Sequence, residues 1–178
     1  MNFGVMFLPV FRASTTAFVL GLGVFAALDA LRLSVDIPLL SGGAGMLVIW
    51  FFVFSLHVNR RRHAGRGVGL SFLPVVFAIM AKGIAVASAV LQKAMESMMA
   101  FAESNGIDTA DVEELTGAIN DPGFVEAWQA DMESNPEIIL EWAAQSDWAS
   151  YLGFWGVIAL FALWFANMKK SGGSIESA

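Results

Sequence analysis

Two charged side chains, Asp29 and Lys82, stand inside long apolar runs of the sequence and are its strongest candidates for chemistry. A charged group at the centre of a membrane-spanning helix costs roughly 2.5 to 3.5 kcal/mol, so it should face protein or water rather than lipid. We take the apolar run that contains Asp29 to rise outward from Ala13 and the run that contains Lys82 to rise outward from Leu70. At a rise of about 1.5 Å per residue along a helix, both charges then lie within about one helical turn of the same depth in the membrane. We therefore predict an ion pair between Asp29 and Lys82.

The same two residues allow a second interpretation, in which they line a path for an ion or a proton. Such a path uses a series of ionisable side chains that continues through the membrane. The apolar runs contain no further acidic residue that would extend this series. We favour a structural or partner-binding pair, and a transporter or channel role is the alternative.

No other group of residues predicts catalysis, a metal site or a cofactor. The chain has no cysteine, which excludes disulfides, thiolate nucleophiles and iron–sulfur clusters. His57 and His63 lack carboxylate neighbours, so we expect them at a membrane interface rather than on a metal. The acidic stretch 108–114 lacks the central glycine and the terminal glutamate of an EF-hand calcium loop. We expect a protein that is not an enzyme and that binds neither a metal nor a cofactor.

The elements that position these residues are four long apolar runs in a chain of which 57% is hydrophobic. A helix needs about twenty apolar residues to cross a bilayer, and the runs have this length. The pattern predicts an all-α, polytopic membrane protein with a small extracytoplasmic helical cap between spans three and four. The predicted spans cover residues 13–31, 39–58, 69–91 and 148–168.

This pattern divides the chain into four parts. Residues 1–92 form three transmembrane helices, and they begin with a segment, 1–11, that is too short to span and should lie at the interface. Residues 93–147 form the acidic helical cap, 148–170 the fourth transmembrane helix and 171–178 a flexible cytoplasmic tail. Within the cap, Asp108 is expected to cap a helix that includes 115–119, and a turn at 120–123 precedes a helix at 124–133.

Charge is segregated along the chain. Four arginines crowd the connection after the second run: Arg60, Arg61, Arg62 and Arg66. The stretch 96–147 holds most of the acidic residues and contains no Lys or Arg. Because loops rich in Lys and Arg stay in the cytoplasm, we expect cytoplasmic N- and C-termini and an acidic segment on the opposite side. The arginine cluster should anchor this topology or bind anionic lipid headgroups.

Small residues mark the expected contacts between helices. Ala13, Ala17 and Gly21 recur at intervals of four in the first run, and Gly83 lies in the third. Small side chains at this spacing let the backbones of two membrane helices approach closely. We therefore predict helix packing at these four positions.

Two motifs in the first ninety residues resemble those of a family of small bacterial inner-membrane proteins, domain-of-unknown-function family eight hundred and five. Residues 11–14, Phe-Arg-Ala-Ser, followed by Phe18, are similar to a Gly-Arg-x-Ser motif before the first span of that family. Residues 61–66, followed by Gly69 and Pro74, are similar to an Arg-x-His-Asp-x-Gly-Arg-Ser-Gly-Trp motif. Phe11 replaces the glycine of the first motif, Ala64 replaces the aspartate of the second, and its tryptophan is missing. The resemblance implies a bacterial inner membrane, hence a periplasmic acidic segment, and no settled activity.

These observations favour a non-enzymatic accessory subunit of a larger inner-membrane complex of respiratory or photosynthetic type. Its expected partners are other integral membrane subunits and phospholipid, with no nucleic acid. The cap face around Phe124 and Trp128 is the expected docking surface. The alternative is a small transporter or channel component that uses Lys82 and Asp29.

Overall fold

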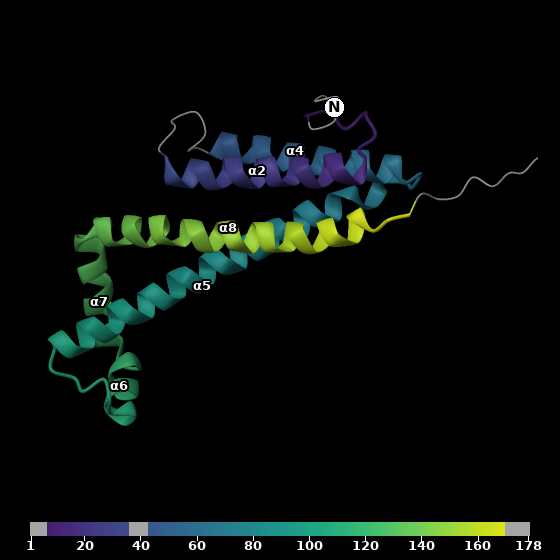
Figure 1. The fold of residues 1–178 in the computed structure, drawn as a ribbon. Coiled ribbons are helices and arrows are strands. Elements are labelled where there is room, and N and C mark those ends of the chain that lie inside the picture. Colours follow the sequence, from purple (N-terminus) through teal and green to yellow (C-terminus); the bar gives the residue numbers. More distant parts are fainter. Residues whose placement is uncertain (1–6, 36–42, 170–178) are drawn as a thin grey trace, which may run out of the picture. The chain divides into compact units, whose positions relative to one another are not determined.

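The computed structural model describes residues 7–35 and 43–169, and over these residues every regular element is helical, as predicted (Figure 1). The elements are α2 (Thr15–Ser34), α4 (Gly43–His63), the 3-10 turn η1 (Val68–Phe72), α5 (Leu73–Ser104), α6 (Val112–Ile119), α7 (Pro122–Ser134) and α8 (Pro136–Ala166). The predictions for 1–6, for the start of the second span at 39–42 and for the tail 171–178 lie outside the described residues. The described residues form two compact units, one made of those up to 82 and those from 151 onward, the other of residues 83–150.

Within the described residues, three helical segments are long and apolar enough to cross a membrane. These segments are Thr15–Ser34, Val68–Ser104 and Pro136–Ala166. The second predicted span, α4, is not among them, because its described part ends in a polar turn that contains Asn59 and three consecutive arginines. The structure therefore supports three of the four predicted spans by length and composition.

The first helix begins at a local capping contact. The Ser14 hydroxyl accepts a hydrogen bond of 3.2 Å from the backbone N–H of Ala17, which satisfies one of the free donors in the first turn. At the other end, the Val35 N–H bonds the Leu31 carbonyl. The predicted span 13–31 is thereby shifted by two to three residues toward the C-terminus.

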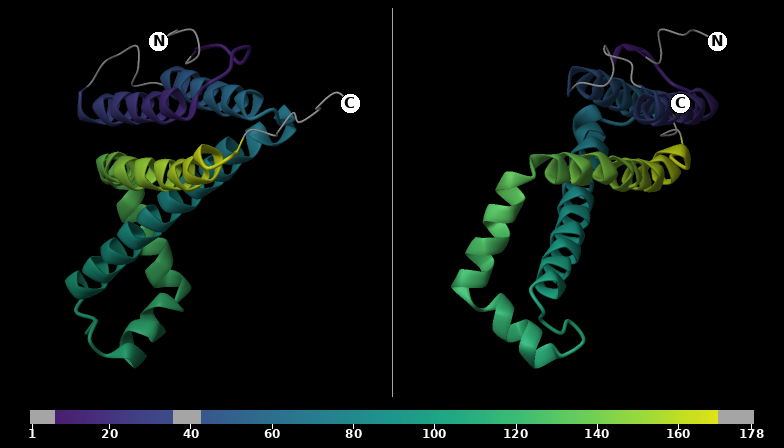
Figure 2. Two further views of the ribbon diagram at one scale, coloured as in Figure 1. Left: turned by 45° about the vertical axis from the view of Figure 1, so that its right-hand side comes forward. Right: turned by 90° about the vertical axis from the view of Figure 1, so that its left-hand side faces the viewer.

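Helices α2 and α4 lie side by side and antiparallel (Figures 1 and 2). The Ala13 N–H donates to the Asn59 carbonyl at 3.0 Å, where α2 starts and α4 approaches its end. Farther along, the rings of Phe25 and Phe52 stack with centroids 5.1 Å apart. This hairpin brings the end of α4 to the start of α2.

The part of α8 after residue 150 completes the core of the first unit. Phe165 is fully buried and packs against Phe18 of α2, with ring centroids 6.4 Å apart. Phe161 stacks on Phe77 of α5 at 6.0 Å. The buried core comprises Ala13, Phe18, Leu22, Phe25, Ile49, Val53, Leu56, Ala78, Phe154, Trp155, Ile158 and Phe165.

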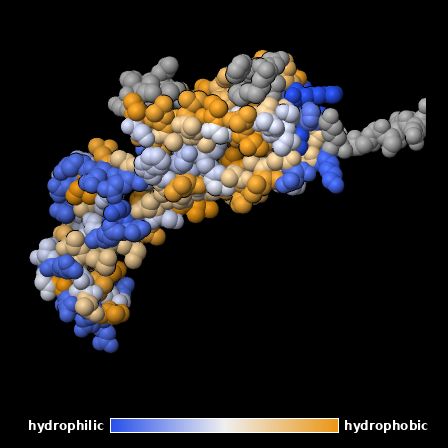
Figure 3. All heavy atoms as spheres, viewed as in Figure 1, coloured by the Kyte–Doolittle hydropathy of each residue, from blue (hydrophilic) through white to orange (hydrophobic). Residues whose placement is uncertain are grey.

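The outer surface of the first unit is unusually apolar (Figure 3). Large apolar side chains of α8 are exposed. About two-thirds of the surface of Leu152, Leu160 and Leu163 is accessible. Apolar side chains are prominent on the visible face of α2 and of the later part of α8, and hydrophilic ones gather where α4 ends. A water-soluble protein rarely leaves so many large apolar side chains exposed together.

The second unit contains the acidic helices. Helix α6 is capped by Asp111, whose carboxylate accepts hydrogen bonds from the N–H groups of Glu113 and Glu114 at 2.9 and 3.3 Å. The prediction of Asp108 as the cap is wrong, because Asp108 accepts from the Ala110 N–H and so closes a turn before the helix. A cap must directly precede the first helical residue for its side chain to reach these N–H groups.

The next two helices both start with proline. Helix α7 begins at Pro122, capped by Asp121, so it includes two residues that we had predicted to be part of the turn at 120–123. Proline suits the first helical position because that position has no use for an N–H. Helix α8 runs unbroken from Pro136 into the fourth predicted span.

Candidate functional site

The end of α4 turns sharply and thereby arranges the four arginines. Gly65 has a φ of 68°, a left-handed conformation that glycine adopts without steric cost. Its N–H bonds the Arg62 carbonyl at 3.1 Å, and the Arg66 N–H bonds the Arg61 carbonyl at 3.0 Å. These two bonds are those of a Schellman motif, which closes a helix and reverses the chain. As a result, Arg66 returns toward Arg61.

Arg60 is buried and binds the end of α8. Its Nε donates to the Phe165 carbonyl at 2.9 Å, and its Nη2 donates to the carbonyls of Ala166 and Met168, both at 2.9 Å. Only 3% of the residue is exposed. The last carbonyls of a helix lack partners within the helix and carry a partial negative charge. Arg60 therefore caps α8 across more than a hundred residues of sequence.

Arg61 is also buried and is held within its own loop. Its Nε donates to the Gly67 carbonyl, and its guanidinium lies 5.8 Å from the centre of the Phe165 ring. Arg62 and Arg66 are exposed. The predicted lipid-binding cluster thus divides into two arginines that bind protein groups and two that face outward.

A basic pocket of about 450 Å³ lies beside this loop. Three of its lining residues are cations, namely Arg61, Arg66 and Lys169. The other walls come from Leu70, Trp164, Asn167 and Met168. The pocket brings together side chains from α4, the following loop and the end of α8, a juxtaposition that the sequence pattern did not predict.

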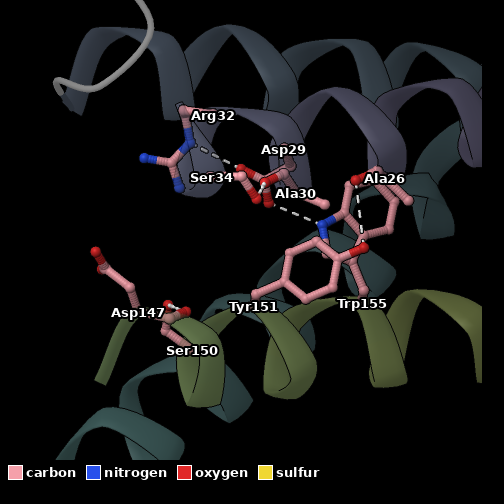
Figure 4. Close-up of polar contacts among 9 residues, drawn as sticks. All are labelled: Ala26, Asp29, Ala30, Arg32, Ser34, Asp147, Ser150, Tyr151 and Trp155. Atoms are coloured by element: carbon pink, nitrogen blue, oxygen red, sulfur yellow. Dashed lines mark hydrogen bonds and ion pairs between the residues drawn. The ribbon is translucent and has the colours of Figure 1, made fainter. Parts of the chain in front are cut away.

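Asp29 forms a second polar site in the first unit (Figure 4). Its Oδ1 accepts a hydrogen bond of 2.9 Å from Arg32 Nε, one turn along α2. Its Oδ2 accepts a hydrogen bond of 2.8 Å from the indole Nε1 of Trp155 on α8. Next to it, the Tyr151 hydroxyl donates to the Ala26 carbonyl at 3.3 Å. Only 7% of the Asp29 residue is exposed, so these contacts take the place of water.

The Asp29 carboxylate connects α2 to α8 through its hydrogen bonds, and neither of its oxygens is without a donor. Each carboxylate oxygen already accepts a hydrogen bond, one from a cation and one from a neutral donor. Lys82 lies on α5 and is half-buried. Its pairing with Asp29 stays a prediction. Sequence reasoning missed Trp155, whose only signal was an indole N–H that needs an acceptor in an apolar run.

His57 is buried in the protein core, and its expected depth at a membrane interface stays a prediction. The side chain is fully buried between the rings of Phe18 and Phe165, each with its centroid 5.1 Å away. Because the Val53 carbonyl can only accept, His57 Nδ1 is the donor of their 2.7 Å bond. The imidazole therefore packs as an aromatic side chain in the core near the end of α4.

The residues predicted to pack helices have different surroundings. A Cβ at Gly21 would lie 2.9 Å from both methyl groups of Leu56, so α2 and α4 pack tightly at this point. Ala13 is buried and Ala17 is half-buried. Gly83 is exposed, at the start of the second unit.

Small residues also line an apolar groove between α2 and α8. The groove has a volume of about 330 Å³ and contains Gly23 and Ala26 on α2 and Ala159 and Ala162 on α8. The small side chains leave room beside the two backbones that a larger residue would fill. This opening lies beside the Trp155 ring.

The two residues predicted for docking by the cap face inward within the second unit. Phe124 packs against Phe101 of α5, with ring centroids 5.4 Å apart. The Trp128 Nε1 donates to the Ser97 hydroxyl of α5 at 3.3 Å. Both side chains are half-buried. They hold α7 against the end of α5, which leaves only their outer edges for a partner.

Comparisons with known proteins place the chain in no family. No protein-family model matches it, and neither does any curated protein or solved structure. The resemblance of the first ninety residues to the uncharacterised inner-membrane family stays a prediction. Among the residues that the structure describes, no three His, Asp or Glu side chains gather in a way that would hold a metal ion.

Proposed function

We propose that this chain is a four-span protein of a bacterial inner membrane and a non-enzymatic accessory subunit of a larger complex there. The observation that carries the proposal is the distribution of polarity in the first unit. Large apolar side chains of the helices are exposed, while Asp29 and Arg60 are buried and hydrogen-bonded. A bilayer favours this arrangement, because lipid accepts apolar surface and rejects unpaired charge.

Treating α4 as the fourth span is part of this proposal. Its 21 residues would extend about 31 Å at 1.5 Å per residue, close to the thickness of a hydrocarbon core. It lies antiparallel to α2, as consecutive spans joined by a short connection do (Figure 2). Its polar last turn would then lie at the membrane surface with the other cations.

The distribution of cations supports cytoplasmic termini and a periplasmic acidic segment. Arg12 precedes α2, the arginine cluster ends α4, and Lys169 follows α8. Contacts between Ala13 and Asn59 and between Arg60 and Phe165 bring these three helix ends together. Apart from Arg32, which binds Asp29, the cations near the ends of these helices gather at one end, and this is the arrangement that the positive-inside rule favours.

An accessory role fits the groove between α2 and α8. Small residues at a membrane helix surface let a second helix approach closely. The groove therefore suits contact with a helix of another integral subunit. Phospholipid would cover the remaining apolar surface.

Purification of the tagged chain from its native membranes in mild detergent, followed by native mass spectrometry, tests the proposal. We expect other membrane subunits at a fixed stoichiometry. A tagged, unrelated four-span protein from the same membranes controls for nonspecific recovery. Recovery of the chain alone, or only as a homo-oligomer, would contradict the accessory role.

The alternative, a small transporter or channel component, would use Lys82 and Asp29 on its path. The two hydrogen bonds that Asp29 accepts favour a structural role instead. Flux measurements on liposomes that contain the purified chain distinguish the two functions. Solute movement by the chain alone that is lost on Asp29→Asn would favour the alternative.

A further inference from the structure

We propose that the basic pocket at the end of α4 binds the phosphate of an anionic phospholipid headgroup. This inference rests on the membrane location proposed above, and it assigns a ligand and a site to what was only a cluster of arginines. The pocket is the one lined by Arg61, Arg66 and Lys169.

The first argument is the lack of negative charge near the pocket. Within the described residues of the first unit, the one carboxylate is Asp29, and its oxygens bind Arg32 and Trp155. Asp29 lies on the last turns of α2, whereas the pocket residues are near the start of α2 in space, since Ala13 bonds Asn59. No described carboxylate of the first unit can therefore neutralise the three cations.

The second argument is that the site is built rather than a chance cluster of flexible side chains. Arg61 is only 7% exposed, and its Nε is bound to the Gly67 carbonyl, which fixes its guanidinium at the pocket wall. The Schellman turn at Gly65 places the next cation, Arg66, beside it. Arg60 holds the end of α8, and with it the backbone that leads to Lys169. Each cation thus reaches the pocket through a defined backbone contact.

The third argument selects a lipid over a soluble phosphate. Two walls of the pocket are large apolar side chains, Leu70 and Trp164, and each is about half exposed. An inorganic phosphate has no use for apolar walls, whereas a phospholipid places a phosphate and the start of its acyl chains side by side. Tryptophan is also enriched at the level of lipid headgroups. Basic pockets between membrane helices on the cytoplasmic side are suited to anionic headgroups.

The test measures lipid retention by the full-length chain in native mass spectrometry. The protein is purified in detergent and mixed with equal amounts of phosphatidylglycerol and phosphatidylcholine. We expect preferential retention of phosphatidylglycerol. A cation at the membrane surface contributes about 1 kcal/mol, so R66Q and K169Q should each lower the preference roughly fivefold, and together roughly thirtyfold.

The matched control is R12Q, which removes one exposed cation of the same charge that does not line the pocket. We expect R12Q to keep the preference. An equal loss in R12Q and R66Q would overturn the proposal, because it would mean diffuse attraction to the basic end. Unchanged preference in the double variant would overturn it as well. If the double variant fails to fold, the single variants decide the question, because both side chains are exposed.

A second arm adds inorganic phosphate at constant ionic strength. We expect the lipid to stay bound. Its displacement would overturn the lipid assignment and give the site to a soluble phosphate. Lipid retention is read on the isolated chain and the accessory role on its partners, so either proposal can fail while the other stands.

Discussion

Replacing Arg60 with methionine should release the end of α8 from α4. Methionine keeps the length and the apolar stem of the side chain but loses all three donated hydrogen bonds. Those bonds, to Phe165, Ala166 and Met168, measure 2.9 Å each. A hydrogen bond to a charged group contributes about 1.5 to 3 kcal/mol, and a buried acceptor that loses its partner costs about 1 to 3 kcal/mol.

The expected magnitude follows from the exposure of the three residues. Phe165 is fully buried, so without Arg60 its carbonyl keeps only the 3.3 Å hydrogen bond from the Met168 N–H, whereas Ala166 and Met168 are half-buried and their carbonyls can bind water. Removing the guanidinium also removes the cost of burying it, which offsets part of the loss. We therefore expect a destabilisation of roughly 3 kcal/mol, which for a chain of this length lowers Tm by roughly 6 to 12 °C.

The assay is thermal unfolding of the detergent-purified full-length chain, with hydrogen exchange of residues 163–169 as a local measure. Arg62→Met is the matched control, because Arg62 is exposed on the same turn. Arg60→Lys should have an intermediate effect, since one ammonium cannot reproduce the fork of the guanidinium. Equal Tm values for Arg60→Met and Arg62→Met, with no change in exchange near the end of α8, would refute the reasoning.

Two further predictions concern the contacts of α2. Trp155→Phe keeps an aromatic ring but removes the indole donor to the buried carboxylate of α2. We expect the free energy of unfolding to fall by about 1 to 3 kcal/mol, measured by thermal unfolding. An unchanged Tm would mean that the bond contributes nothing. Gly21→Val forces atoms against the buried leucine methyls of α4 and should cost about 1 to 3 kcal/mol. Gly23→Val is the control, because no atom lies within 4 Å of a Cβ there; similar losses in both variants would argue against close contact at Gly21.

Much of the helical framework could be predicted from the sequence because the signals that decide it are local. Ser14 caps α2 through a residue three positions away, and Pro136 starts α8. The error at Asp108 has the same local origin, because Asp111 is a second residue of the same type only three positions on. Composition likewise identified the long apolar helices. Composition identifies α4 less clearly as a membrane span, because one polar turn lowers the mean hydropathy of that helix.

The site was less predictable because its residues meet across large distances in sequence. Arg60 looked like a lipid contact, since a run of arginines carries the same charge whether it faces a membrane or a helix end. Only the packing of α8 beside α4 brings the carbonyls at 165–168 within hydrogen-bonding distance of the Arg60 guanidinium. Asp29 was recognised as a buried charge, but its contact with Trp155 spans 126 positions, and no periodic pattern encodes such a partner.

The sequence by itself thus determined the all-helical class, the approximate positions of the helices and the separation of basic from acidic segments. These follow from the hydrophobicity, capping and charge of neighbouring residues. Tertiary structure alone decided which charges are buried, which carbonyls Arg60 caps and which cations share a pocket. Those outcomes depend on which helix faces meet. A buried polar side chain forms a hydrogen bond or an ion pair with whichever group the packing places beside it, because water is then excluded.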